Sequence, residues 1–419
     1  IGPQQYGEAL ARVGGKLDQA DFGSFKVELG KQVPIADDGG KATVTTPAAL
    51  LDRLAPDEGF RLFGRRFTPD AYMLGRLVAP RVGPPTREGQ FTLTRTLDGR
   101  AIRGLPRGLD VMAVLGSSRA RELLRDLGDD AYRGYDDGVA DLRRRFASFD
   151  AVDWNRNLHW SWLYALQPLL AEGDAASPAF RTSMAYRTKA LNTALAFWAH
   201  RRQDVALYAR ESKTAEMKTL EAKAQEAKAL KVPRFPPDIA RGATDVPYVE
   251  PLPDLYARLL ALARMTRDGL TTMGVLDAPG KARLEHLEKL LRGLKGIAEK
   301  ELAGQALTAD DQAFLRRFVE DPEGVQLQKA LTTVAVATIH TDANSNQVLQ
   351  EATGSLDVGL FLYQRPDGRQ ALAAGPVLSY YEFKRPSADP LTEAGWRRLL
   401  TGATPARPSW FIVHPGGTR

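Results

Sequence analysis

Apolar residues recur every three or four positions along most of the chain, which is the spacing of one face of an α-helix. The longest such stretch runs from Arg181 to Ala209, and its wide apolar stripe includes Leu191, Leu195 and Trp198. This stripe predicts one long helix that buries a broad side. The same spacing predicts further helices at 254–266, 281–302 and 309–320.

Small polar residues mark several helix starts, because their side chains can cap the first turn. Thr46–Pro47 and Thr68–Pro69–Asp70 combine such a cap with a proline at the first helical position. Asp153 or Asn155 can cap a helix from Leu158 to Leu170. The helical part of the chain is therefore expected to begin at residue 46.

After Leu331 the apolar positions alternate, which is the spacing of β-strands. Pro366–Asp367–Gly368 has the composition of a tight turn and predicts a hairpin. The fold class predicted is therefore mainly α, with a large helical body and a C-terminal antiparallel β-rich unit. Extended runs are expected at Val334–Thr338, Leu356–Tyr363, Ala371–Phe383 and Trp410–Val413.

These patterns divide the chain into three parts. Residues 1–45 are weakly patterned and are expected to form an N-terminal arm, residues 46–330 the helical body and residues 331–419 the C-terminal β-rich unit. Within the body, residues 211–250 alternate Glu with Lys and then contain several prolines. This composition predicts an exposed charged helix followed by a linker.

Composition is that of an ordinary globular protein, with 43% apolar and 26% charged residues. The densest apolar stretch, Leu163 to Leu170, contains Gln167 and Pro168 and is shorter than the ~18 residues of a membrane span. No membrane span is therefore expected. The net charge of +6 is spread thinly, whereas nucleic-acid binding needs clustered basic residues, so no nucleic-acid partner is expected.

Several classes of active site have no support in the sequence. The chain contains no cysteine, which excludes thiol nucleophiles, zinc–thiolate sites and disulfides. The motifs GxSxG, HExxH, the P-loop and the dinucleotide fingerprint are absent. Of the five histidines, His286 and His414 are expected to be structural.

The stretch Trp154–Tyr164 contains four aromatic rings around His159. Such rings can line a cleft that stacks against a glycan or a peptide. At helical spacing they can equally belong to the hydrophobic core, and both interpretations stay open. We expect the core interpretation to be the commoner outcome for this pattern.

His340 ends a predicted strand and precedes an Asp/Asn-rich turn that includes Asp342, with Glu351 nearby in sequence. Imidazole and carboxylate side chains together can bind a divalent metal such as calcium or zinc. The alternative is an Asx-type hairpin turn in which His340 bonds to backbone. A metal site at His340, Asp342 and Glu351 is one hypothesis for this region.

The long predicted helix carries a second group of polar candidates. His200 and Asp204 are four residues apart and share a face, and Lys189 can lie along the same wall. A ligand site and a buried ion-pair network both fit this pattern. Arg202 and Glu250 are the first partners expected for Lys189 and Asp204.

Several segments, in order from about Phe60 to Leu400, resemble the bacterial and archaeal domain-of-unknown-function family numbered three-one-six-zero. The resemblance implies an extracytoplasmic protein (periplasmic, secreted or lipoprotein). One departure is Gln203, where the family tends to have histidine. The matching segments are Phe63–Asp70, Gly108–Ser117, Lys189–Leu195, Asp204–Ala209, Tyr248–Pro251, Val336–Asp342 and Ser379–Phe383.

Two functions remain open. The first is an exported binding or assembly protein with an internal polar groove for a glycan or peptide. The second is a metal-assisted hydrolase that acts on a glycan or peptide through His340, Asp342 and Glu351. The candidate groove residues are Lys189, His200, Asp204, Tyr208, Glu250 and Tyr381.

Overall fold

A computed structural model of the protein describes residues 68–96, 99–173, 178–209, 248–320, 333–364, 370–402 and 405–411, and the backbone of 35–36 and 42–43. Contacts divide the chain into two compact units. One comprises Ile1–Arg66 with Ala209–Ala227, and the other comprises Phe67–Tyr208 with Lys228–Arg419. The predicted Thr46–Pro47 helix start, and the predicted exposed helix and linker up to residue 247, lie outside the described residues.

In the first unit, the described residues form two short strands, β1 (Ile35–Ala36) and β2 (Ala42–Thr43), which pair antiparallel. The described helices and the C-terminal strands belong to the second unit, except that the last residue of α10, Ala209, falls in the first.

The second unit begins with α4 (Pro69–Arg76), which starts at the predicted Thr68–Pro69 signal. The hairpin of β3 (Leu93–Arg95) and β4 (Ala101–Arg103) follows. The helices that follow the hairpin are α5 (Gly108–Val114), α6 (Ser118–Asp126), α7 (Tyr135–Ala147) and α8 (Ala151–Trp154). Every residue of α5 is buried, so this short helix lies within the core.

Helix α9 (Leu158–Leu170) has the predicted bounds but a different cap. Asn157 Oδ1 accepts hydrogen bonds from the N–H groups of His159 and Trp160. Asp153 was predicted as a cap, but it belongs to α8, where it forms a capping box with Asp150. Asn155 lies at the end of that same helix and cannot cap the next one.

Helix α10 (Met184–Ala209) begins three residues later than predicted, because a 3₁₀ turn, η2 (Ala179–Thr182), occupies the first positions. Leu191, Leu195 and Trp198 are buried, as the apolar stripe predicts. Helices α11 (Pro253–Thr272), α12 (Ala278–Leu302) and α13 (Ala309–Glu320) confirm the three later helices. Helix α11 packs between α9 and α12.

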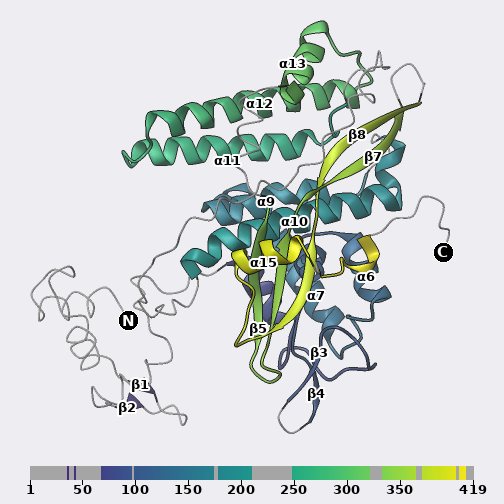
Figure 1. Ribbon diagram of the computed structural model, residues 1–419, viewed down its shortest axis with the longest axis vertical. Helices are drawn as coiled ribbons and strands as arrows, with labels where there is room; N and C mark the ends of the chain where they lie inside the picture. Colours follow the sequence, from purple (N-terminus) through teal and green to yellow (C-terminus); the bar gives the residue numbers. More distant parts are fainter. Residues whose placement is uncertain are drawn as a thin grey trace, which may run out of the picture. The chain divides into compact units, whose positions relative to one another are not determined.

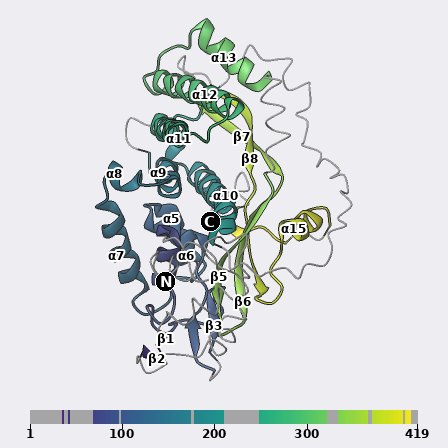
Figure 2. The same ribbon diagram turned by 90° about the vertical axis from the view of Figure 1, so that its left-hand side faces the viewer.

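Over its described residues, the C-terminal part forms five antiparallel strands in two sheets. Strands β5, β6 and β9 form one sheet, in the order β5–β6–β9, and β7 and β8 form a separate two-stranded ribbon. Figures 1 and 2 show this ribbon rising from the level of α10 toward α12. The strands are β5 (Ala335–Asp342), β6 (Gln347–Thr353), β7 (Leu356–Gln364), β8 (Gln370–Leu378) and β9 (Tyr381–Pro386).

The mainly α fold with a C-terminal antiparallel β-rich part is therefore confirmed. None of the described helices is both long and apolar enough to cross a membrane. The strand predicted at Trp410–Val413 is wrong over its described residues, since Ser409–Phe411 forms a 3₁₀ turn, η3. Its turn is closed by Phe411 N–H, which donates to Pro408 O, while the Trp410 ring packs 6.3 Å from that of Tyr380.

Candidate functional site

Lys189 and Glu250 form an ion pair on one side of α10. Lys189 Nζ lies 2.5 Å from Glu250 Oε2, and the two side chains are 20% and 26% exposed. This confirms Glu250 as the partner expected for Lys189. A pair with this exposure is sheltered from bulk water but can still be reached by a ligand.

Aromatic rings surround this pair. Lys189 Nζ lies 5.7 Å from the ring centre of Tyr186 and 5.4 Å from that of Phe361, distances typical of cation–π contacts. The Phe180 ring meets those of Tyr186 and Tyr248 edge to face, at 5.3 and 6.1 Å. All four rings are half-buried. We call these residues, with Lys189 and Glu250, the Lys189 site.

Four separate segments build the Lys189 site. Tyr186 and Lys189 come from the first turns of α10, and Phe180 from the 3₁₀ turn η2 that precedes it. Tyr248 and Glu250 lie just before α11, and Phe361 lies on β7. Tyr256 Oη donates to the backbone oxygen of Glu250 at 3.1 Å, which fixes that segment on α11.

Two groups beside the site titrate abnormally. Burial, together with the neighbouring Glu250, raises the pKa of Tyr186, so its phenol stays protonated. Burial also raises the pKa of Glu301 to about 8, although the Val249 N–H donates to its carboxyl. Glu301 is therefore mainly protonated at neutral pH. The charged groups in or beside the site include Lys189, Glu250 and Arg181, whose charge acts on Tyr186.

A small polar pocket adjoins the Lys189 site and shares Tyr186 with it. Within it, Arg187 donates to Ser118 Oγ at 2.7 Å and to Glu172 Oε1 at 3.2 Å. The pocket is not lined by any of His340, Asp342, Glu351 or His200. Its lining residues are Ser117, Ser118, Arg119, Leu169, Leu170, Ala171, Glu172, Arg181, Tyr186, Arg187 and Ala190.

His200 and Tyr381 do not join the Lys189 site. His200 lies farther along α10, and only the backbone of Asp204 and Tyr208 is described, so their side chains lie outside the described part. Tyr381, on β9, packs instead against Trp396 of α15 (Glu393–Leu400), at 5.0 Å between ring centres. Among the predicted groove residues whose side chains are described, the structure therefore brings together Lys189 and Glu250.

His159 and its aromatic neighbours confirm the core interpretation. Trp154 and Trp160 are 2% and 4% exposed and belong to the main hydrophobic cluster. His159 Nε2 lies 3.0 Å from Asp70 Oδ1, and Trp198 Nε1 donates to Asp70 Oδ2 at 2.8 Å.

Asp70 is a buried carboxylate, so its negative charge needs partners in the core. Burial opposes its ionisation, but Arg202 and the hydrogen bonds from His159 and Trp198 outweigh it and hold the pKa of Asp70 well below its usual range. Arg202 Nη1 lies 3.4 Å from Asp70 Oδ2. Arg202 therefore stabilises a carboxylate in the core, which is a structural role.

The predicted metal residues lie on one hairpin but are not grouped. Asp342 Oδ1 accepts from Asn344 N and Nδ2 at 3.1 and 2.9 Å, and Oδ2 accepts from Ser345 Oγ at 2.6 Å. These bonds form the Asx-type turn that was the alternative to a metal site. Burial lowers the pKa of His340, although Asp342 and a backbone contact at Gly104 oppose that effect.

Glu351 lies farther along the same hairpin. Asp342 pairs with Gln347 in the β5–β6 register, so Glu351 is four residues, about 13 Å, along β6 from that level. In the part of the chain that the structure describes, no three His, Asp or Glu side chains gather closely enough to hold a metal. Metal binding stays a prediction, which metal analysis of the purified protein tests.

Gly104 provides a test of how tightly the hairpin packs. A Cβ atom on Gly104 would lie 1.9 Å from Thr94 Oγ1 and 2.6 Å from Asp342 Oδ2. Gly104→Ala is therefore expected to lower the free energy of unfolding by about 1–3 kcal/mol through overpacking. Gly75→Ala is the control, because its Cβ would meet nothing within 4 Å. Equal melting temperatures for the two variants would contradict the packing at Gly104.

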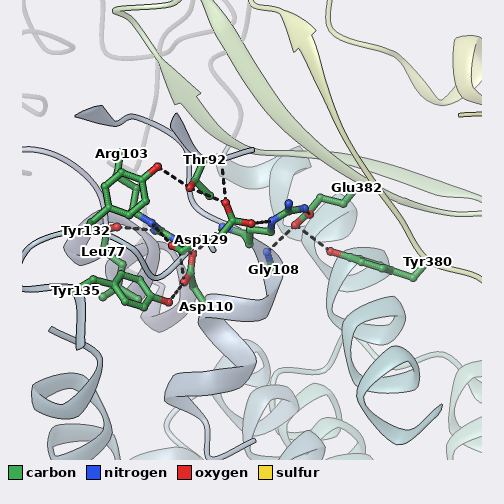
Figure 3. Close-up of polar contacts among 11 residues, drawn as sticks. Leu77, Thr92, Arg103, Gly108, Asp110, Asp129, Tyr132, Tyr135, Tyr380 and Glu382 are labelled. Carbon is green, nitrogen blue, oxygen red and sulfur yellow. Dashed lines mark hydrogen bonds and ion pairs between the residues drawn. The ribbon is translucent and has the colours of Figure 1, made fainter. Parts of the chain in front are cut away.

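A buried charged network lies beneath the three-stranded sheet (Figure 3). Arg103 and Asp110 have no exposed side-chain surface, and Arg103 Nη2 donates to both Asp110 oxygens at 2.9 and 3.1 Å. Arg103 also donates to the backbone oxygens of Leu77 and Asp129, and Tyr135 Oη donates to Asp110. Both buried charges thus have the partners that burial demands.

A second buried cation links the body to β9. Arg107 Nε donates to Asp129 Oδ2 at 2.6 Å, and Arg107 Nη1 donates to Glu382. Gly108 N–H, in the first turn of α5, donates to the other Glu382 oxygen at 3.0 Å. Asp129 also accepts from the Thr92 backbone and hydroxyl. The β3–β4 hairpin, α5 and β9 are therefore held by one set of charges.

Glu351 lies at the end of this network. It is fully buried and pairs directly with Glu382 across the β6–β9 ladder. Burial and the nearby charge of Glu382 raise the pKa of Glu351 well above its usual range, although Tyr380 and Arg202 favour ionisation. The Glu351 carboxyl therefore favours its protonated form more strongly than a solvated glutamate does. Its enclosure makes it part of the fold and not of an accessible site.

Apart from Glu351, the residues of this network were not among the candidates predicted from the sequence. The signal that could have found Asp110 is its place in the apolar run Leu109–Leu115, since a lone charge in a buried helix needs a partner. No comparable signal marks Arg103, Arg107 or Asp129. Their partners come from elements far apart in the sequence.

Comparison with known proteins assigns the chain to a family. A search of curated proteins gave no match, and a search of solved structures gave no match either. The profile of one family matches residues 1–411, which is nearly the whole chain. The chain therefore belongs to the family described as "Protein of unknown function (DUF3160)".

Proposed function

We propose that the protein is an exported binding protein whose ligand, a glycan, binds at the Lys189 site. The observation that carries the proposal is a partly exposed ion pair with four half-buried aromatic rings grouped beside it. Aromatic rings stack against the apolar faces of sugars, while a cation and a carboxylate can bond to hydroxyl groups. Export is supported by the extracytoplasmic character that the family resemblance implies.

Binding is favoured over catalysis by where the charged groups lie. Both carboxylate oxygens of Asp342 already accept hydrogen bonds from residues of its own turn. Glu351 is fully buried beside Glu382. A general acid or base must reach the substrate atom that it serves. The Lys189 site meets the requirement of access, but its carboxylate Glu250 is already bonded to Lys189, which suits a recognition site.

Lys189→Met tests the proposal. The change removes the charge and keeps an apolar stem of similar length, so the affinity for a bound oligosaccharide is expected to fall at least about tenfold, which is ~1.4 kcal/mol. Titration calorimetry against a panel of neutral and acidic oligosaccharides measures the affinity. Lys295→Met is the matched control, because Lys295 forms a surface pair with Glu299.

Two results would contradict the proposal. One is that no oligosaccharide of the panel binds to the wild-type protein, while a peptide panel does bind, which would assign the site to peptides. The other is that Lys189→Met and Lys295→Met bind the oligosaccharide equally well. Melting temperatures close to that of the wild type confirm that either variant is folded.

A further inference from the structure

The small polar pocket beside the Lys189 site is lined by arginines. Arg119, Arg181 and Arg187 all belong to its wall. Tyr186 lines it too, and the Tyr186 ring also contacts Lys189, so the pocket and the site share that side chain. The side chains of Arg119 and Arg187 are only 11% and 22% exposed. A guanidinium group shielded in this way attracts an anion more strongly than a solvated one does.

A carboxylate of the chain itself already binds in this pocket. Ser118 Oγ donates to Glu172 Oε1, and Arg187 Nη2 donates to the same oxygen at 3.2 Å. Arg187 also donates to Ser118 Oγ at 2.7 Å, which leaves the hydroxyl proton for the carboxylate. Glu172 is 63% exposed, and an exposed ion pair contributes little to stability. An incoming carboxylate can therefore replace that of Glu172.

The charges of the pocket favour an anion as the replacement. Glu122 accepts from Arg119 at 2.9 Å and from Arg187 at 2.6 Å, so two arginines share this one carboxylate. The second carboxylate that pairs with Arg187 is that of Glu172. If Glu172 moves out and a neutral group moves in, Arg187 and Arg119 keep only Glu122 between them. A ligand carboxylate restores the lost pairing, and a neutral ligand of the same shape does not.

We propose that the ligand of the Lys189 site is an acidic glycan, and that the carboxylate of one of its uronic acids binds Arg187 and Ser118 in place of Glu172. This inference rests on the proposed glycan-binding function and names the class of glycan. A guanidinium group and a hydroxyl are donors that suit a carboxylate. The next sugar lies along Tyr186 toward Lys189, because Tyr186 belongs to both the pocket and the site.

A tetrasaccharide of uronic acid and its methyl ester test the proposal, because they differ in charge and little in shape. Titration calorimetry measures the two dissociation constants, and the ratio of ester to acid is the readout. The wild-type protein should bind the acid at least about tenfold more tightly than the ester. Arg187→Met keeps an apolar stem but removes the guanidinium donors, so it should bring the ratio close to one.

Glu172→Gln should act in the opposite direction. Glutamine carries no charge and competes less well for Arg187, so the ratio should rise about threefold or more above the wild-type value. Glu88→Gln is the matched control, because Glu88 is 69% exposed and pairs with Arg95, as Glu172 pairs with Arg187. Glu88→Gln changes the net charge by the same amount and should leave the ratio unchanged. Arg95→Met is the corresponding control for Arg187→Met.

Three outcomes would overturn the proposal. Equal affinity of the wild-type protein for acid and ester removes the carboxylate subsite and leaves the glycan-binding function standing. Binding of neither overturns it too, and the proposed function falls with it only if the whole oligosaccharide panel fails to bind. A preference for the acid that persists in Arg187→Met, or that does not rise in Glu172→Gln, places the carboxylate elsewhere. If Arg187→Met does not keep the wild-type melting temperature, the comparison of Glu172→Gln with Glu88→Gln decides.

Discussion

Asp110→Ala is expected to lower the free energy of unfolding by about 3–5 kcal/mol, because it leaves Arg103 as a buried charge without its counter-charge. Asp110 also accepts from Tyr135 Oη and from the Arg107 backbone N–H at 2.7 Å. A domain is commonly stable by only ~5–15 kcal/mol, so this loss is a large fraction of the total. Urea denaturation followed by circular dichroism measures it.

Asp136→Ala is the matched control. Asp136 is 73% exposed and pairs with Arg121 at 2.5 Å, so its loss should cost less than about 1 kcal/mol. If Asp110→Ala does not fold, Asp110→Asn, which keeps the shape and one acceptor oxygen, should fold with reduced stability. A loss below about 1 kcal/mol for Asp110→Ala would contradict the buried pair.

Glu351→Gln is expected to make the protein more stable than the wild type at alkaline pH. The folded state raises the pKa of Glu351, so it holds a proton that the unfolded chain releases above its ordinary value of 4.5. The wild type therefore loses about 1.4 kcal/mol per pH unit from near pH 4.5 up to the folded pKa. Glutamine has no proton to lose, so the variant escapes this cost.

Urea denaturation of both proteins between acid and alkaline pH tests the prediction. Subtracting one pH profile from the other cancels the other titrating groups. Glu285→Gln is the control, because Glu285 is an exposed residue of α12 that pairs only loosely with Lys281, at 4.0 Å. Parallel profiles for the wild type and Glu351→Gln would show that Glu351 is already ionised in the folded protein.

Most helices could be predicted from the sequence because their apolar residues repeat with the helical period. The ends of α9 were predicted although its cap was not, since the period is set by many residues and the cap by one. Strand β6 was missed because it carries polar residues at buried positions. Gln350 and Glu351 are 1% and 0% exposed, and their partners are invisible in the local pattern.

The candidate site could be predicted only in part, for a related reason. Lys189 and Glu250 form an ion pair across 61 residues. Lys189 was predicted from its place on the long helix, and Glu250 as one of the first expected partners. Two of the four rings come from further segments, Phe180 from η2 and Phe361 from β7. No periodicity in the chain indicates that these segments meet.

The bond between Arg107 and Glu382 has a consequence for the order in which the chain can fold. The two residues are 275 positions apart, so Arg107 is synthesised long before its partner. Arg107 can pair with Asp129 early, but until β9 emerges Arg107 and the first turn of α5 lack the Glu382 carboxylate. The helices of the body can form early, but their final packing must wait for nearly the whole chain, and contacts of such long range are slow to form.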